Sequence, residues 1–267
     1  MNWMNLTDAT AAAQELIKKI PNEYDAIVGI PRSGMWLASM IACKFGRPLA
    51  VPDGGWWVSS GMTRRFINNA LLVDDTVSLG GAMAKAKMHL DFPAKTAALI
   101  VQPGSEHLVD YYQVVMEHPR LYEWNLAHAK KGRVAYDIDG VLCPNPPAYT
   151  PEFLASDEYA DFIRFAPPRL LPAYGIDLVV TGRTERHREA TEEWLARHGV
   201  HYGALSMVPE VHERTAAYHA GWKARACVDH AIDYMVESDI HQAVLIGEYL
   251  EIPVVCTDNM RLYGGRK

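Results

Sequence analysis

RVAYDIDGV, residues 133–141, is a short apolar run that ends in Asp137-Ile138-Asp139-Gly140. Such a run predicts a buried strand, and two aspartates two apart at its carboxyl end are expected to point the same way. Open α/β sheets bind ligands at the carboxyl ends of their strands. The pair can hold Mg²⁺ while one carboxylate attacks a phosphorus atom. Asp-x-Asp-Gly alone also describes an ordinary turn with solvated acids.

The pattern around this stretch predicts a parallel sheet for the second half of the chain. IDLVVTG (176–182), DYMVESD (233–239) and IPVVCT (252–257) are further apolar runs, and 183–199 has the periodicity of an amphipathic helix. Apolar runs that alternate with helices are typical of parallel α/β sheets. The short interval between Leu142 and Ile176 leaves room for only a minimal cap over the site.

Three further motifs follow the aspartate pair in order. Thr181 ends a strand and is expected to open a helix, whose N-terminus would bind phosphate. Lys223 offers a cation for a phosphoryl group, although a lysine is most often a surface residue. Glu237 and Asp239 add carboxylates at the end of a strand, where they could ligate a metal.

This order of motifs over residues 132–267 resembles the haloacid dehalogenase (HAD) superfamily of phosphatases. The resemblance implies a Mg²⁺-dependent phosphatase in which Asp137 forms an aspartyl-phosphate and Asp139 serves as general acid and then as base. Thr181 and Lys223 would hold the phosphoryl oxygens. The implied magnesium ligands are Asp137, Asp139, Glu237 and Asp239.

The first half repeats the alternation of strands and helices. Strands are expected at 25–30, 70–75 and 95–101, with helices between them, after an opening helix that Thr7 or Asp8 would cap. The strand at 70–75 leads into Asp74-Asp75-Thr76 and a loop of Ser78, Leu79, Gly80, Gly81 and Ala82. Carboxylates can accept bonds from ribose hydroxyls, and loop N–H groups at a helix N-terminus can bind a 5′-phosphate. A plain βα turn with two solvated acids is the alternative.

This loop resembles the phosphoribosyl pyrophosphate (PRPP) loop of type I phosphoribosyltransferases, and the likeness covers about residues 20–126. Arg32, Ser33 and Gly34 fall where that family has its pyrophosphate loop, and 56–66 falls where it has a mobile lid. Residues 107–126 are similar to the hood that holds the base, with Trp124 or Tyr122 as the stacking ring. The resemblance implies transfer of a phosphoribosyl group to a base.

Several positions depart from that family. Leu79 and Ala82 stand where threonines are usual, Ser78 where purine-salvage members have an aspartate, and Gln102 where they have a lysine. A neutral hydroxyl cannot do the proton chemistry of a carboxylate unaided. Two hypotheses therefore stand for the first half: it transfers a phosphoribosyl group to a base other than a 6-oxopurine, or it only binds PRPP or a nucleotide as a sensor.

Composition sets the frame for these motifs. The 267 residues suffice for two domains, and the net charge of −6 is the sum of +1 over residues 1–131 and −7 over residues 132–267. We expect two doubly wound parallel-sheet α/β domains in series: a phosphoribosyltransferase-like domain at 1–130 and a HAD-like domain at 131–267. The acidic balance argues against nucleic acid as a partner and favours small phosphorylated substrates such as PRPP, a nucleotide or a sugar phosphate.

Compartment and assembly follow from weaker signals. The four cysteines form no Cys-x-x-Cys pair, no secretory leader pattern opens the chain, and no apolar run is long enough for a membrane span. We expect a cytoplasmic protein without a membrane partner. A homodimer through the first domain is compatible with the resemblance.

Overall fold

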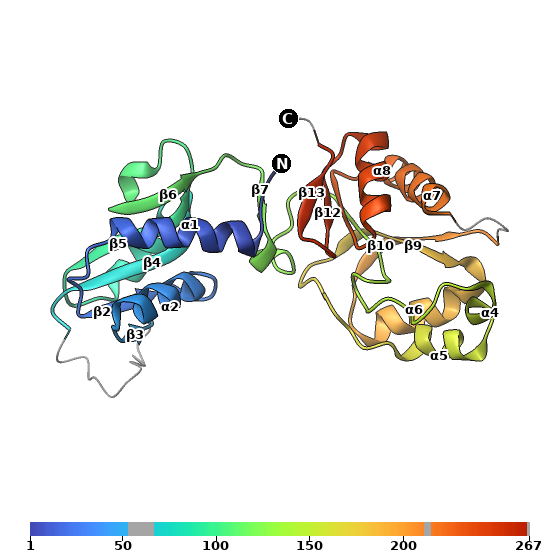
Figure 1. The fold of residues 1–267 in the computed structure, drawn as a ribbon, viewed down its shortest axis with the longest axis horizontal. Helices are drawn as coiled ribbons and strands as arrows, with labels where there is room; N and C mark the ends of the chain where they lie inside the picture. Colours follow the sequence, from blue (N-terminus) through green and yellow to red (C-terminus); the bar gives the residue numbers. More distant parts are fainter. Residues whose placement is uncertain (53–66, 211–214, 266–267) are drawn as a thin grey trace. The chain divides into compact units, whose positions relative to one another are not determined.

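The computed structural model describes residues 1–52, 67–210 and 215–265, which divide into two units. One unit spans residues 2–124, and the other spans 125–267 together with Met1. Both are α/β units built on mainly parallel sheets, which confirms the predicted class (Figure 1). Within the described ranges, no helix has both the length and the apolar character needed to cross a bilayer.

The first unit contains a five-stranded sheet in the order β3-β2-β4-β5-β6, in which every neighbouring pair is parallel. A separate parallel pair joins β1 to β7. The elements of this unit are β1 (Asn2–Met4), α1 (Leu6–Lys19), β2 (Ala26–Gly29), α2 (Gly34–Phe45), β3 (Leu49–Ala50), β4 (Ala70–Val77), α3 (Gly81–Met88), β5 (Ala94–Val101), the 3-10 helix η3 (Glu106–Leu108), β6 (Tyr111–Val115) and β7 (Arg120–Tyr122). The 3-10 helix η4 (Glu123–Asn125) leads into the second unit.

Helices cover both faces of this sheet. Leu71 and Val73 of β4 pack in one cluster with residues of α1 and α2, whereas Leu72 packs in a second cluster with Met83 and Ala86 of α3. Alternate residues of a strand point to opposite faces, so a strand that is apolar on both faces becomes buried on both. The run ALLV at the start of β4 is apolar for this reason.

The second unit contains a six-stranded sheet in the order β10-β9-β8-β11-β12-β13, parallel except for the last pair. Its elements are β8 (Val134–Tyr136), α4 (Pro151–Leu154), α5 (Asp157–Phe165), β9 (Ile176–Thr184), the 3-10 helix η5 (Glu185–His187), α6 (Arg188–Arg197), β10 (Tyr202–Val208), α7 (Ala216–Asp229), β11 (Tyr234–Glu237), α8 (Ile240–Leu250), β12 (Val254–Cys256) and β13 (Arg261–Tyr263). Figure 1 shows α7 and α8 side by side, and α4, α5 and α6 grouped elsewhere on the same unit. Between β8 and β9 stand only α4 and α5, two short helices.

The structure corrects two predicted helix starts. Asn5, not Thr7 or Asp8, caps α1, and its side chain accepts a hydrogen bond from the Asp8 N–H. The helix expected from Arg183 begins only at Arg188, because β9 continues to Thr184 and pairs there with β10. Thr181 therefore lies within a strand and does not open a helix.

Candidate functional site

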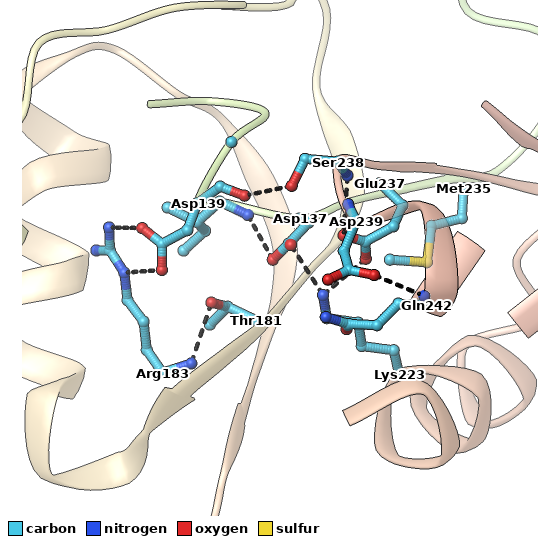
Figure 2. Close-up of polar contacts among 12 residues, drawn as sticks. Asp137, Asp139, Thr181, Arg183, Lys223, Met235, Glu237, Ser238, Asp239 and Gln242 are labelled. Carbon is cyan, nitrogen blue, oxygen red and sulfur yellow. Dashed lines mark hydrogen bonds and ion pairs between the residues drawn. The ribbon is translucent and has the colours of Figure 1, made fainter. Parts of the chain in front are cut away.

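Three neighbouring strands of the second unit bring the predicted groups to one edge. β8 lies between β9 and β11, and all three run parallel. Asp137 follows β8, Thr181 lies near the carboxyl end of β9, and Glu237 ends β11. Because parallel strands end at the same edge, residues far apart in sequence lie close together there (Figure 2).

Lys223 of α7 joins two of the carboxylates. Its Nζ lies 2.8 Å from Asp137 Oδ2 and 2.6 Å from Glu237 Oε2. The Lys223 side chain is 2% exposed and that of Glu237 is 0% exposed. The alternative that Lys223 is an ordinary surface lysine is thus wrong, and its ammonium group is a buried part of the site.

Lys223, Asp137 and Glu237 form a buried triad in which neighbouring charges shift the pKa values of Lys223 and Asp137. Burial alone would lower the pKa of Lys223, but Asp137 and Glu237 outweigh burial and raise it. Burial, reinforced by Glu237, raises the pKa of Asp137 well above its usual range, while Lys223 opposes that rise. Lys223 therefore stays charged and donates hydrogen bonds to both Asp137 and Glu237.

Asp137 and Asp139 do not point the same way, contrary to our expectation. β8 ends at Tyr136, and a turn closes directly after it through the bond from Val141 N–H to Ile138 O. Figure 2 shows the Asp139 carboxylate turned toward Arg183, while Asp137 faces Lys223. The rule of alternating side chains applies only inside a strand, and these aspartates lie beyond it.

Arg183 is a buried residue of this group that the sequence analysis did not select as a site residue. Its fully buried guanidinium donates from Nη2 to Asp139 Oδ1 at 2.6 Å and from Nε to Asp139 Oδ2 at 3.1 Å. Between Thr181 and Thr184 the pairing of β9 with β10 is irregular, because Met207 pairs with Thr181 and the next residue pairs with Thr184. Bulges re-aim side chains next to sites, and no sequence signal marked this one.

Thr181 is fully buried beside Arg183. Its Oγ1 accepts a hydrogen bond from the Arg183 N–H at 3.2 Å. The hydroxyl can still donate its own proton. It lies in the same group of side chains as Asp137 in Figure 2.

Gly140 and Ser238 connect the loop after β8, which carries Asp137 and Asp139, to the loop after β11, which carries Asp239. Ser238 Oγ donates to Asp139 O at 2.9 Å, and Gly140 has a left-handed φ of 79°. A Cβ at position 140 would lie 2.3 Å from Ser238 Oγ. Only glycine fits, so the loop after β8 is tied directly to the loop after β11.

The four predicted magnesium ligands are not assembled as a set. Across residues 1–52, 67–210 and 215–265, no three His, Cys, Asp or Glu side chains are grouped so that they could hold a metal ion. Asp139 is bound to Arg183, and Glu237 uses Oε1 for the N–H groups of Ser238 and Asp239 and Oε2 for Lys223.

Two carboxylates remain suited to magnesium. Asp239 uses Oδ1 to cap α8 by accepting from the Gln242 N–H, and Asp137 keeps acceptor capacity beside Lys223. Mg²⁺ is commonly held by one or two carboxylates together with water and substrate phosphate. The donor chemistry of Asp137 and Asp239 therefore fits this ion.

The acidic pair of the first unit lies inside β4, as the predicted strand at 70–75 implied, and this strand runs two residues further than predicted. β4 continues to Val77, so Asp74 and Asp75 lie near its carboxyl end and both are buried. Burial, reinforced by Asp75, raises the pKa of Asp74 to about 8. Asp74 is therefore mostly protonated at neutral pH.

Trp124 contacts this pair instead of standing free as a stacking ring. Its Nε1 donates to Asp75 Oδ2 at 2.7 Å, and its ring stacks on Tyr122 with centroids 4.8 Å apart. The predicted hood and the predicted ribose site are thus in direct contact, and one face of Trp124 is already covered.

The two predicted phosphate loops follow neighbouring strands. Arg32 and Ser33 precede α2, and Ser33 is its N-cap residue without a side-chain capping bond. Gly34 approaches β4 so closely that a Cβ there would lie 2.8 Å from Val73 O.

The second predicted phosphate loop follows β4. Thr76 is half-buried, Leu79 is 87% exposed, and Gly80 adopts a left-handed φ of 74° before α3. Gly81 and Ala82 form the first turn of α3. The expected lid at 56–66 lies outside the described residues.

Comparison with known proteins gives a fold likeness for part of the chain. No protein-family model and no curated protein matches it. The chain is similar to the purine phosphoribosyltransferase of Pyrococcus horikoshii, with 21% identity, 46% of this chain and 94% of that chain covered, and a TM-score of 0.38. It is similar to the xanthine-guanine-hypoxanthine phosphoribosyltransferase of Helicobacter pylori, with 16% identity, coverages of 47% and 93%, and a TM-score of 0.38.

The orotate phosphoribosyltransferase of Aeropyrum pernix is also similar, with 17% identity, coverages of 41% and 72%, and a TM-score of 0.34. At these identities the likeness concerns the fold alone, over less than half of the chain.

Replacing Lys223 by methionine should destabilise the second unit by about 3–5 kcal/mol, because Asp137 and Glu237 would be buried without their counter-charge. Chemical denaturation measures the change. Arg225→Met is the matched control on the same helix, since Arg225 pairs only with the exposed Asp229, and it should change stability by less than about 0.5 kcal/mol. Equal effects of the two substitutions would contradict the buried triad.

Asp74→Asn should stabilise the protein at alkaline pH. The folded state keeps the Asp74 proton up to about pH 8, whereas the unfolded chain releases it near the ordinary carboxyl pKa of about 3.9. The wild type therefore loses stability as pH rises between these values. At pH 9 the variant should be more stable by at least about 1.4 kcal/mol, the equivalent of one pKa unit, and the gain should shrink toward pH 4. A variant less stable than wild type at pH 9 would refute the shift.

Proposed function

We propose that residues 131–267 hydrolyse phosphomonoesters through an aspartyl-phosphate on Asp137. The buried bridge from Lys223 to Asp137 and Glu237 is the observation that carries this proposal. A carboxylate beside a fixed ammonium group can meet a phosphate dianion without facing its repulsion alone. Nucleophilic catalysis needs such an activated and oriented group.

The proposed reaction has two steps. An Asp137 oxygen forms a bond to phosphorus while the bond to the leaving oxygen breaks, and the leaving oxygen takes a proton. Water then attacks phosphorus, loses a proton, and releases phosphate and the free carboxylate. Lys223 and the Thr181 hydroxyl would donate to the phosphoryl oxygens during both steps.

Asp139 is the proposed proton carrier, and Arg183 positions it. The two bonds from Arg183 fix the orientation of the Asp139 carboxylate. To serve the leaving group, Asp139 must face the Asp137 side of the loop, so exchange of an Arg183 bond accompanies the proton transfer. Arg183 is thus a positioning residue in this scheme.

Magnesium belongs to the same proposal, with Asp137 and Asp239 as its protein ligands. When bound, the ion neutralises charge on the phosphoryl oxygens. Glu237 stays bound to Lys223 and helps to hold its ammonium group next to Asp137.

For residues 1–130 we propose binding of a phosphorylated ribose and transfer of a phosphoribosyl group to a base. Asp74 and Asp75 lie at the carboxyl edge of the central strand β4, next to the turn at Gly80 that begins α3. Buried carboxylates can accept from ribose hydroxyls, and the loop N–H groups can bind the 5′-phosphate. A nucleotide made or bound by one unit would then be a substrate for the other.

Asp137→Asn should lower phosphate release at least about a thousandfold, because the amide is a poor nucleophile. The assay measures phosphate from p-nitrophenyl phosphate and from a panel of nucleotides and sugar phosphates. Asp161→Asn, an exposed aspartate of α5 in the same unit, should keep full activity. A wild-type protein that hydrolyses none of these substrates would overturn the phosphatase proposal.

Mg²⁺ should raise the melting temperature of the wild type, since an ion that binds only the folded state stabilises it. Asp239→Asn should reduce this rise. Asparagine caps helices as well as aspartate does, so the cap of α8 is kept and only the ligand charge is lost. Asp229→Asn, exposed at the end of α7, is the control. Equal magnesium shifts in both variants would exclude Asp239 as a ligand.

PRPP separates the two hypotheses for the first unit. With PRPP, Mg²⁺ and a panel of bases, we expect pyrophosphate release that depends on one of the bases. Calorimetric binding of PRPP without pyrophosphate release would favour the sensor hypothesis. Absence of any PRPP binding would contradict both.

A further inference from the structure

Three polar side chains meet beside the predicted PRPP loop. Ser78 Oγ lies 2.7 Å from Arg120 Nη2 and 3.3 Å from His118 Nε2. Ser78 directly follows β4, Arg120 begins β7, and His118 lies two residues before Arg120. Neither His118 nor Arg120 was selected from the sequence.

Arg120 is unusual because it is a buried cation without an acidic partner. Its residue exposure is 2%, and its second hydrogen bond, at 2.7 Å, goes to the carbonyl of Met116. Among the described residues, no carboxylate lies within ion-pair distance of it. Burying a charge against neutral partners alone is costly, and Ser78 Oγ is one of the oxygens that receive this charge.

The chemistry of the groups fixes the direction of the bonds. A guanidinium only donates hydrogen bonds, so Ser78 Oγ accepts from Arg120 and its own O–H must be donated elsewhere. His118 Nε2 can accept it when the imidazole proton is on Nδ1. A positive charge at the oxygen also favours loss of the hydroxyl proton.

Ligands can reach this group. Ser78 is half-buried and His118 is exposed, whereas Arg120 lies behind them. Ser78 directly follows β4, the strand of Asp74 and Asp75, so it lies at the carboxyl edge where α/β sheets bind ligands. It therefore stands where the acceptor of a ribose phosphate bound at that edge would have to lie.

We propose that Ser78 and His118 form a proton relay for phosphoribosyl transfer, with Arg120 as its positioning residue. This inference rests on the proposed function of the first unit. A ring nitrogen of the base forms the bond to ribose C1′, and the bond from C1′ to pyrophosphate breaks. The N–H proton of the base passes to Ser78 Oγ as the Ser78 proton passes to His118 Nε2. The acceptor is thus a nitrogen heterocycle with an N–H to lose.

His118→Ala is the direct test. We expect kcat for pyrophosphate release to fall about 100-fold or more, in the range of general-base effects, with KM for PRPP and calorimetric PRPP binding unchanged. Added imidazole should restore part of the rate, which a merely structural role would not allow. His89→Ala, an exposed histidine at the end of α3 in the same unit, should behave as wild type.

A second variant tests the relay without depending on His118. Ser78→Asp places a carboxylate base next to Arg120, so it should remain active when combined with His118→Ala. It should also raise the melting temperature, because it supplies the missing counter-charge.

The outcomes distinguish this inference from the function on which it rests. A wild-type protein that releases pyrophosphate, together with a fully active His118→Ala variant, would overturn the relay and leave transfer intact. A wild-type protein that binds PRPP but transfers to no base would overturn transfer and the relay with it. Loss of PRPP binding in His118→Ala would assign His118 to binding and overturn its role as a base.

Discussion

The buried ammonium of Lys223, held between Asp137 and Glu237, is the interaction on which the second unit's site depends. It connects α7 to the ends of β8 and β11, and it gives two buried carboxylates their counter-charge. Removing one partner of such a buried ion pair leaves an unpaired charge in the interior. This lowers stability far more than the loss of an exposed ion pair does. Asp239 and the guanidinium-bound Asp139 border the same space (Figure 2).

Residue order along the chain was enough to predict which side chains meet at this edge, because parallel strands bring their carboxyl ends together. It was not enough to predict where each side chain points. Asp139 turns to Arg183 since β8 ends before it, and Arg183 reaches inward since β9 continues past Thr181 with an irregular step against β10. Both orientations depend on where the pairing of a strand with its neighbours ends. The neighbouring strands determine that point, and the local sequence does not.

The first unit shows the same limit. The strand at 70–75 and its two carboxylates were predicted, but β4 continues to Val77, and Trp124, the last residue of the unit, binds Asp75. The cap of α1 at Asn5 was misplaced for a local reason, since several nearby polar residues can cap a helix equally well. Arg120 carried no signal at all, because its burial beside Ser78 follows from the pairing of β7 with β1.

The two units share one arrangement of carboxylates but differ in the charges beside them. Each places paired carboxylates at the carboxyl edge of a parallel sheet, but only the second unit balances them with a buried lysine and a buried arginine. In the first unit the buried arginine contacts a hydroxyl instead. The second unit thus has buried cations beside its carboxylates, as the proposed phosphoryl chemistry requires, whereas the first unit has a neutral oxygen next to a histidine.

Locating the phosphoryl group during turnover tests the central claim most directly. The wild-type protein is mixed with a phosphomonoester that it hydrolyses, quenched in acid within the first turnover, and digested for mass spectrometry. The account predicts a hydroxylamine-sensitive phosphoryl group on the peptide that contains Asp137, and none when Asp137 is asparagine. Phosphate release with no labelled peptide, or with the label on another residue, would contradict it.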